Sequence, residues 1–448
     1  MRDVPQVNGS GWLSSLRLTR AYLRDPLGVM QKVYVRHGSV AQLNLFGMPA
    51  VVLLGPDANE LVLRNAQDQF SSELGWNPVI GRTFPRGLIS LDGEQHRGDR
   101  RIIGAAFKPA VMRHHLETMA RGIERDLADW PEHLLFYPMA KNLTLTLAAK
   151  TLLGLPIGTQ ARKVSRAFVA MLGASTALVR RPFPGNALWR GLRGREQLAA
   201  RLQAQIAERR RNPGADIFSA MCNLVDEDGS TLPDQSIIDH TALLLMAAHD
   251  TTTSALTSIA YMLGRHPDWQ EQVREELRQW RHSHGDRLTQ DGLGQLPITE
   301  MVLNETLRMM PPVPSLPRGL RAPLDFDGCR IPAGAAVGIH ILHTHYMEAL
   351  WPEPDLFDPL RFSPDQIRQR HRYAWLPFGG CAHMCLGLHF ATMQVKLFLF
   401  ELLHQRRIVL ADSYVPRMQW LPIAHPTDHL PLHIFRRDGP SSICQELR

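Results

Sequence analysis

Two cysteines, Cys381 and Cys385, lie four residues apart in the stretch PFGGCAHMCLGLHF, residues 377–390. An apolar pattern of helical spacing follows Cys385, which predicts this residue at the first turn of a helix, where backbone N–H groups and the helix dipole favour a thiolate. The neighbouring glycines let the backbone approach a large flat group, while Phe378 and Met384 can keep water from the sulfur. A zinc pair or a redox pair would be the alternative, but no second cysteine pair lies nearby.

Asp250 and Thr251 fall in the middle of the most hydrophobic long stretch, residues 241–263. This stretch is long enough to cross a bilayer, but His249, Asp250 and several threonines at its centre favour a buried core helix. Buried polar groups must be hydrogen-bonded or they destabilise the fold. A purely structural role is open to both, because a threonine can bond the carbonyl one turn back and an aspartate can pair with a buried base.

Two further pairs of polar residues occur at helical spacing. Glu305 and Arg308 lie three residues apart on one predicted helical face, before Pro311 and Pro312 end the helix. The common meaning of such a pair is a solvated surface bridge worth roughly a few tenths of a kcal/mol. His96 and Arg100 lie one turn apart and would by themselves indicate only a basic helix start.

The elements that must position these residues are mostly helical. The spacing of apolar residues predicts helices over much of residues 56–310, most clearly at 56–65, 112–130 and 197–211, and again at about 388–405. Strand-like runs occur at 40–55, near 315–342, and at 407–411 and 431–435. The sequence therefore predicts one domain, residues 1–448, mainly α with a minor β-sheet subdomain made of about 35–56, 315–345 and 405–437.

Composition limits the function classes. The chain has 448 residues, 44% of them hydrophobic, with a net charge of +7, but its arginines are spread out and lack the aromatic interleaving of a nucleic-acid surface. We therefore expect no nucleic-acid partner and infer an acidic protein partner. Five cysteines without regular spacing fit a reducing cytoplasm. The N-terminal residues lack the continuous apolar run of a signal peptide, and no transmembrane anchor is predicted.

The decamer FGGCAHMCLG closely resembles the haem-binding loop of the cytochrome P450s, F-G-x-G-x-[HR]-x-C-x-G. The resemblance implies that Cys385 is the axial thiolate ligand of the iron of haem b. It also implies that Phe378 and Gly387 belong to the haem-binding loop and that His383 reaches a haem propionate. Cys381 stands where the family usually has glycine.

Other segments resemble the family in the same order along the chain. DGEQHRGDRRIIGAAF and PSLPRGL imply that His96, Arg100 and Arg318 bind the haem propionates. LLLMAAHDTTTSAL resembles the distal helix, [AG]-G-x-[DE]-T-[TS], which implies that Thr251 organises water at bound dioxygen and that Asp250 relays protons.

NETLRMMPPVP resembles the E-x-x-R helix of the family, and FDPLRF resembles its P-E-R-F segment. The resemblance implies a structural cluster of Glu305, Arg308 and Arg361 that fixes the haem-loop side of the fold. Leu360 replaces the usual glutamate, so we expect a thinner local network there.

The resemblance implies a cytochrome P450 fold, with haem between a long central helix and the cysteine loop. It implies a haem-thiolate monooxygenase that inserts one atom of dioxygen into a C–H bond of a small lipophilic substrate. Electrons would come indirectly from NAD(P)H through a ferredoxin or flavodoxin and its reductase. A peroxide-using haem-thiolate enzyme would not need Asp250 and Thr251, and a non-catalytic haem-binding protein would be expected to carry a signalling domain, of which none is visible.

The substrate is less well defined by the sequence. In the family, the loop that matches SSELGWNPVIGRTFPRGLISL caps the pocket, which implies an apolar cavity. Two arginines in this loop could meet a carboxylate, which favours hydroxylation of a fatty acid, with a terpenoid or steroid as the alternative, although both could equally face solvent or haem. The residues expected at this pocket are Trp76, Val79, Ile80, Arg82, Phe84, Arg86 and Ala247.

Two surface segments suggest partners. Lys108, Arg368, Arg370 and Arg372 flank segments expected on the thiolate side, which favours docking of an acidic ferredoxin or flavodoxin. The segment 180–195 mixes aromatic and basic residues and could touch lipid headgroups or form a soluble lid. We expect a cytoplasmic monomer, with peripheral membrane contact left open.

Overall fold

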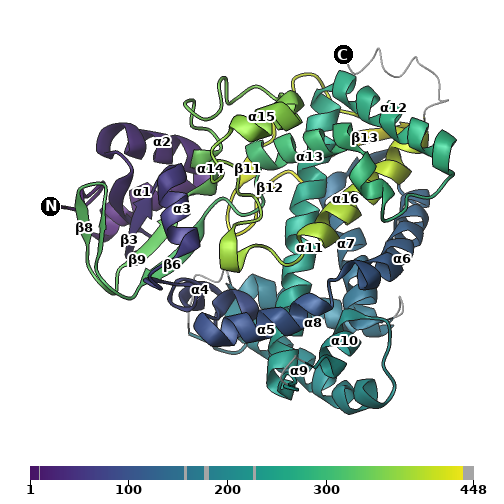
Figure 1. Cartoon of the computed structure of the whole chain (residues 1–448), viewed down its shortest axis with the longest axis horizontal. Coiled ribbons are helices and arrows are strands. Elements are labelled where there is room, and N and C mark those ends of the chain that lie inside the picture. The colour runs from purple at the N-terminus through teal and green to yellow at the C-terminus, as the bar shows by residue number, and fades with distance from the viewer. Residues whose placement is uncertain (10, 156–158, 176–180, 226–228, 437–448) are drawn as a thin grey trace.

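The structure is a computed structural model that describes the chain except residues 10, 156–158, 176–180, 226–228 and 437–448 (Figure 1). The longer helices are α1 (Trp12–Arg24), α2 (Pro26–His37), α3 (Pro56–Arg64), α4 (Ser72–Ile80), α5 (Gly93–Ala105), α6 (Pro109–Ala128), α7 (Phe136–Leu153), α8 (Thr159–Ser175), α9 (Ala187–Arg211), α10 (Ile217–Asn223), α11 (Asp234–Arg265), α12 (Pro267–His284), α13 (Pro297–Met309) and α16 (Leu388–Gln405). Shorter helical pieces are α14 (Ile341–Thr344), α15 (Pro364–Gln369) and the 3₁₀ turns Leu88–Ser90, Gly292–Gln295, Pro359–Phe362 and Cys381–His383.

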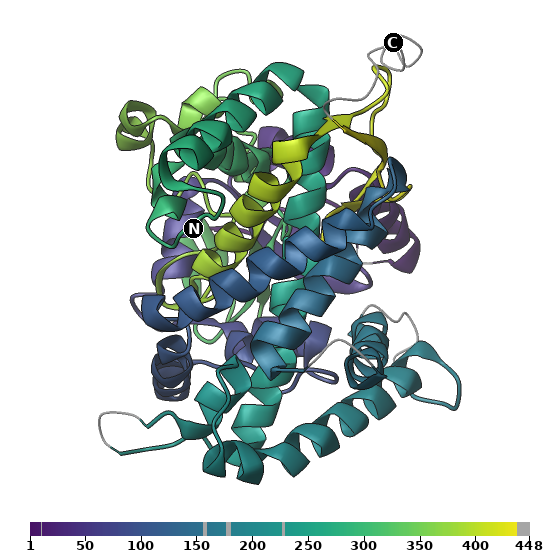
Figure 2. The same cartoon turned by 90° about the vertical axis from the view of Figure 1, so that its right-hand side faces the viewer.

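Helix α11 is the central element of the helical part. It has 32 residues, and it packs against α7, α9, α13 and α16, as Figures 1 and 2 show. Asp234 in its first turn and Arg265 in its last turn complement the helix dipole, and the helix ends at Arg265, with His266 as its C-cap before Pro267. Its buried apolar residues, such as Leu256 and Ile259, join one large core with α16. The predicted core helix at 241–263 is thus the middle and end of a longer helix.

A five-stranded sheet forms the β-rich part near the N-terminus. Its strand order is β2-β3-β9-β6-β4, with β2 and β3 antiparallel and β3 and β9 parallel. The sheet has a separate small core that includes Val40, Leu53 and Ile339. The strands are β2 (Val40–Leu45), β3 (Met48–Leu53), β4 (Phe70–Ser71), β6 (Leu316–Leu320) and β9 (Ala336–Ile339). A second small sheet has the order β1-β8-β7, from β1 (Arg2–Asp3), β8 (Cys329–Ile331) and β7 (Leu324–Phe326).

The predicted β-rich subdomain included residues 405–437, but the strands of this segment do not join the five-stranded sheet. β10 (Arg406–Val409) pairs with β13 (Pro431–Arg436), which pairs in turn with β5 (His133–Leu135), in a sheet of their own. Ile408, Leu432 and Ile434 belong to the large helical core rather than to the core of the five-stranded sheet. The two-stranded β11 (Met418–Gln419) and β12 (His425–Pro426) complete the segment. Among the described residues, no helix is both long enough and apolar enough to span a membrane.

Candidate active site

A cavity of about 280 Å³ lies between α11 and the loop that precedes α16. From α11, Ala247, Ala248 and Thr251 line it, and from the loop, Phe378 and Cys385. Most of its other lining side chains are apolar, and they come mainly from α11, α13, α16 and the loop segments near Leu88, Val313 and Pro377. Residues far apart in the sequence thus face one another across a single space.

The cysteine loop presents the Cys385 sulfur to this cavity. The Cys385 N–H donates to the Phe378 carbonyl at 2.8 Å, which closes the loop just before α16 begins at Leu388. A Cβ added at Gly387 would lie 4.0 Å from the Cys385 sulfur, so the glycine keeps the space beside the sulfur open. Burial raises the pKa of the Cys385 thiol, while the Gly387 N–H and Arg100 oppose that rise. A bound metal cation would overcome this rise, because a coordinating thiol is deprotonated.

Cys381 has a different environment from Cys385. Both cysteines are exposed, but Cys385 is exposed to the cavity, whereas Cys381 is absent from the described lining. The Cys381 sulfur lies 3.5 Å from the Tyr373 hydroxyl. Its φ of 55° is in the left-handed region, where a residue with a Cβ costs roughly 1–2 kcal/mol. The motif usually has glycine at this position. Cys381 stands there instead and keeps a backbone conformation that glycine adopts readily.

Four basic side chains gather at one edge of the cavity. His96, Arg100, Arg318 and His383 all line it, and the rings of His96 and His383 stack with centroids 3.9 Å apart. Burial lowers the pKa of His96 to about 4, of His383 to about 3 and of Arg318 to about 10. Burial also lowers the pKa of Arg100. The protein therefore desolvates four bases at one place.

The described residues provide few anions for this basic cluster. His96 Nε2 is buried without a hydrogen-bond partner, and the side chain of Arg318 donates to the carbonyl of its neighbour Pro317 at 2.8 Å. Asp92, a nearby carboxylate, already binds Arg321 at 2.9 Å and accepts from the Ser72 N–H at 2.8 Å. Two further carboxylates would satisfy the cluster, as the propionates of a haem would. The apolar cavity, the thiol and the basic edge together fit haem b.

Thr251 and Asp250 occupy different sides of α11. The Thr251 hydroxyl donates to the Ala247 carbonyl at 2.5 Å and lines the cavity. Asp250 is absent from the described lining and faces α7, where its Oδ1 lies 3.6 Å from Lys141 Nζ and 2.9 Å from Nδ1 of the fully buried His249. Burial alone would raise the pKa of Asp250, but His249 and Lys141 hold it below its ordinary value. Lys141 has no sequence signal that connects it to Asp250, because the contact is between separate helices.

The expected substrate-pocket residues divide into three groups. Trp76 and Ala247 line the cavity. Ile80 and Phe84 are buried in the large core, and Val79 is exposed. Arg82 and Arg86 are exposed and are absent from the described lining, although they belong to the segment that continues to two lining residues, Leu88 and Ile89. Sequence reasoning missed most of the apolar lining, including Leu243, Leu244, Met246, Leu303, Val313 and Leu316.

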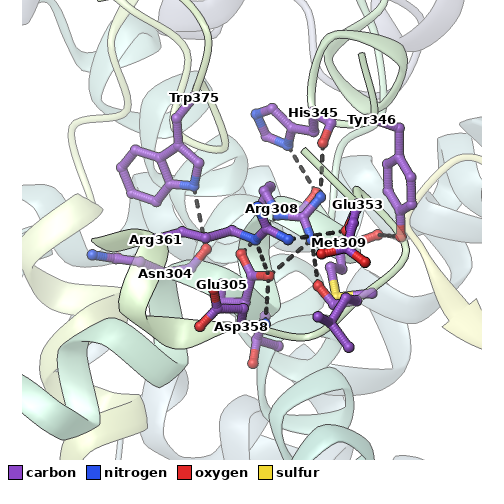
Figure 3. A network of polar contacts seen from close by, with 12 residues as sticks. Asn304, Glu305, Arg308, Met309, His345, Tyr346, Glu353, Asp358, Arg361 and Trp375 are labelled. Carbon is purple, nitrogen blue, oxygen red and sulfur yellow. Dashed lines mark hydrogen bonds and ion pairs between the residues drawn. The ribbon is translucent and has the colours of Figure 1, made fainter. Parts of the chain in front are cut away.

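A buried network of polar contacts joins α13 to residues later in the chain (Figure 3). Arg308 and Glu305 are fully buried and make two hydrogen bonds, at 2.7 and 2.8 Å. Arg361 Nε lies 3.4 Å from Glu305 Oε1, and the Asp358 N–H donates to the same oxygen at 3.0 Å. The structure therefore brings together the three residues that the sequence grouped.

The same network reaches the cysteine loop through His345. The Leu376 N–H donates to His345 Nε2 at 2.9 Å, so the other ring nitrogen carries the proton and donates to the Arg308 carbonyl, also at 2.9 Å. Arg308 in turn donates to the His345 carbonyl at 2.9 Å. Gly379 donates back to the Leu376 carbonyl at 3.0 Å, which connects the network to the loop that carries Cys385.

The basic residues expected to bind an electron donor are not equivalent. Arg370 stacks on Trp351 and Phe362, with its guanidinium carbon 4.1 and 4.7 Å from the ring centroids. Arg368 forms an ion pair with Asp365 of the same short helix. Lys108 and Arg372 are exposed. Of the segment 180–195, residue 180 lies outside the described residues, and the remainder is mostly the start of α9.

Comparisons with known proteins agree with this geometry. The protein-family model described as "Cytochrome P450" matches residues 12–420. The Mycobacterium tuberculosis (strain ATCC 25618 / H37Rv) protein named "Putative cytochrome P450 136" is 37% identical over 419 residues, which are 92% of this chain and 84% of that protein. Cytochrome P450 26B1 of Xenopus tropicalis is 31% identical over 423 residues, which are 90% of this chain and 81% of that protein.

Solved structures show the same fold. The structure named "Retinoic acid bound cyanobacterial CYP120A1" has a TM-score of 0.86 at 28% identity, and the match covers 97% of this chain and 100% of that one. The heme domain of cytochrome P450DA also has a TM-score of 0.86, at 20% identity, and shows the fold alone. Together with the thiol, the basic edge and the apolar cavity, these matches show that the chain belongs to the cytochrome P450 family, as a monooxygenase that depends on an external electron donor.

Proposed function

We propose that this monooxygenase hydroxylates a C–H bond of a long, apolar carboxylic acid, represented by a fatty acid or a retinoid acid. The observation that carries the proposal is the cavity itself, which has an alcohol, Thr251, on one wall and a thiol, Cys385, on the other. The lining between them is mostly apolar, with leucine its most frequent residue, which suits a lipophilic chain. Haem b, when bound, supplies the iron at which dioxygen is activated.

The residues of the chain have separate tasks in this proposal. Cys385 holds the iron, and the basic edge of His96, Arg100, Arg318 and His383 binds the propionates and orients the ring. The Thr251 hydroxyl, which now donates to the Ala247 carbonyl, can turn to hold a water or a proton in the cavity. Asp250, held between His249 and Lys141, exchanges protons with the solvent side of α7 and α11.

The preference for an acid rests on two observations. The solved relative at 28% identity is named for its bound retinoic acid, a long apolar carboxylate. In this chain, Arg82 and Arg86 lie on the segment that leads into the cavity lining at Leu88, so an acid could leave its carboxylate at the surface and pass its chain inward. Electrons from NAD(P)H, through a ferredoxin or flavodoxin and its reductase, complete the proposed activity.

Matched pairs of compounds test the substrate class. Purified haem-loaded protein is titrated with palmitic acid and its methyl ester, and with retinoic acid and retinol, while the haem absorption band is followed. We expect saturable spectral shifts with at least one acid and weaker binding of its neutral partner. Equal or stronger responses to the neutral compounds, or to terpenes and steroids alone, would contradict the acid preference.

Variants at the two arginines separate charge from shape. The double variant Arg82→Gln/Arg86→Gln should bind the acid more weakly, on the order of tenfold, and bind the methyl ester as the wild type does. Arg278→Gln is the matched control. Arg278 is an exposed arginine like the other two, but it belongs to α12, where it pairs with Glu275. An unchanged affinity for the acid in the double variant would show that these arginines do not contact the carboxylate.

A further inference from the structure

Helix α1 exposes most of its large apolar residues, although Tyr22 and the partly buried Leu18 pack against the small core beside it. Its buried residues are Ser15, Thr19 and Tyr22, whereas Trp12 and Leu16 are 72% and 55% exposed. A helix on the surface of a soluble protein normally does the opposite and buries its apolar stripe. The orientation therefore needs an explanation outside the packing of this domain.

The exposed apolar residues of α1 form one stripe. At about 100° per residue, Trp12, Leu16 and Leu23 project within about 40° of one another around the helix axis. Leu13 is also exposed and lies farther around the same side. Leucine and tryptophan in one stripe are the residues that insert into the boundary between lipid headgroups and acyl chains.

The turn between β2 and β3 extends this stripe. The Phe46 N–H donates to the Thr19 hydroxyl at 2.7 Å, and the Gly47 N–H donates to the Ser15 hydroxyl at 2.8 Å. The polar residues of α1 thus bind the turn, and the turn carries two more exposed apolar side chains, Phe46 and Met48. In Figure 1, α1, α2 and the strands β3, β8 and β9 lie at one end of the molecule.

Uncompensated positive charge borders the stripe. Arg17, Arg20 and Arg24 are exposed on the next part of the α1 surface, and Trp12–Arg24 contains no acidic residue. None of the three forms an ion pair or a side-chain hydrogen bond with another described residue. Some exposed arginines elsewhere pair with a neighbouring glutamate, as Arg64 does with Glu60 and Arg278 does with Glu275.

We propose that the face formed by α1 and the β2–β3 turn docks on an anionic lipid bilayer. The stripe of Trp12, Leu16 and Leu23, with Phe46 and Met48, enters the headgroup region, and the three arginines bind lipid phosphates. Apolar insertion combined with basic residues is the chemistry of an interfacial helix, which lies in the membrane surface and does not cross it. The face is separate from the segment 180–195, and the proposal does not depend on which substrate the enzyme hydroxylates.

Vesicle binding of the haem-loaded protein tests this proposal. We expect co-sedimentation with vesicles of phosphatidylcholine containing 30% phosphatidylglycerol, weaker binding to pure phosphatidylcholine, and loss of binding at high salt. Arg17→Gln/Arg20→Gln/Arg24→Gln and Leu16→Ser/Leu23→Ser should each weaken the apparent affinity on the order of tenfold or more. Ile367→Ser and Arg278→Gln are the matched controls, one exposed apolar residue and one exposed arginine, and should bind like the wild type.

Fluorescence places the stripe within the bilayer. Brominated lipids should quench part of the tryptophan emission of the wild type, and Trp12→Phe should lose that part while still binding vesicles, because phenylalanine keeps the apolar contact. Haem spectra and melting temperatures equal to those of the wild type confirm that the variants are folded. No binding to anionic vesicles, as expected if a protein partner covers the face, would overturn the proposal, and so would wild-type binding in both multiple variants.

Discussion

At the scale of single residues, the two cysteines of one loop differ in position and therefore in chemistry. Cys385 faces the cavity beside Arg100, whereas Cys381 lies outside the described cavity lining, next to Tyr373. We predict that Cys385→Ser abolishes the thiolate-type carbon monoxide difference spectrum and that Cys381→Ser keeps it. Loss of that spectrum in Cys381→Ser alone would show that the ligand is assigned to the wrong cysteine.

The substitution Cys381→Gly tests whether the positive φ at this position costs stability. Because φ at Cys381 is 55°, Cys381→Gly removes the cost of a Cβ in the left-handed region. The expected gain is roughly 1 kcal/mol or less in the free energy of unfolding, since glycine is also more flexible in the unfolded chain.

Thr251 should govern how efficiently electrons become product. We predict that Thr251→Ala retains haem binding and consumes reductant, but releases more hydrogen peroxide and less hydroxylated product, because the Thr251 hydroxyl can then no longer hold a water in the cavity. Product, peroxide and reductant are measured per folded haem. Thr252→Ala is the comparison, because Thr252 is the next residue of α11 and also lines the cavity, and it should couple electrons to product as the wild type does. Unchanged coupling in Thr251→Ala would leave only the structural bond to the Ala247 carbonyl as its role.

Lys141 should set the pH range in which Asp250 works. Burial raises the pKa of Asp250, but His249 and Lys141 bring it below its ordinary value, so the ionised form contributes stability that is lost as pH falls through the lowered pKa. Lys141→Met removes one of these charges and should move the acidic limb of the coupling-versus-pH profile to higher pH. Lys141→Arg should restore the wild-type profile, whereas Lys150→Met on the same helix should not alter it. A profile unchanged in Lys141→Met would contradict the role.

Some of these residue relations follow from sequence and others do not. Cys385, Glu305 and Arg308 are recognisable because their spacing within a short segment carries the signal. Lys141 is not, because its contact with Asp250 depends on how α7 packs against α11. The exposure of Arg82 and Arg86 likewise depends on how the segment after α4 folds over the cavity.

At the scale of elements, the network around α13 connects that helix to the cysteine loop. Breaking a buried ion pair leaves an uncompensated charge, so Arg308→Ala should cost about 3–5 kcal/mol of unfolding free energy. Burial already raises the pKa of Glu305 against the opposing effect of Arg308, so the carboxyl should take up a proton in the variant. Denaturant unfolding and haem retention measure the effect.

Arg278→Ala is the matched control for this substitution. Arg278 and Glu275 have the same three-residue spacing as Arg308 and Glu305, but they are exposed, and such pairs contribute about 1 kcal/mol or less. An equal loss of stability in the two variants would show that burial does not distinguish these pairs.

The elements themselves were predicted unevenly. Long helices with regular apolar spacing, such as α3 and α16, agree closely with their sequence signals. The strands β10 and β13 were recognised near their true positions, but the pairing of β13 with β5 was not, because β5 has only three residues and lies about 300 residues before its partner. Short strands carry no local information about which sheet they join.

At the scale of the whole molecule, the charge distribution suggests how electrons reach the buried site. Arg372 is exposed, its guanidinium carbon lies 5.9 Å from the Tyr373 ring centroid, and the Tyr373 hydroxyl lies 3.5 Å from the Cys381 sulfur. Lys108 directly follows Phe107, which lines the cavity. We therefore predict that these two basic residues take part in docking an acidic electron donor such as a ferredoxin or flavodoxin.

Ionic strength and charge neutralisation test this route together. Because electrostatic steering can raise association rates tenfold or more and is screened by salt, reduction by an acidic ferredoxin should slow as salt rises from about 0.05 to 0.5 M. Lys108→Gln/Arg372→Gln should lower the rate at low salt and flatten the salt dependence, since fewer charges attract the donor. The triple variant Arg17→Gln/Arg20→Gln/Arg24→Gln removes more positive charge, but from the α1 face, so it should leave reduction nearly unchanged. If net charge alone determined the rate, the triple variant would have the larger effect, and a rate insensitive to salt in the wild type would exclude electrostatic docking.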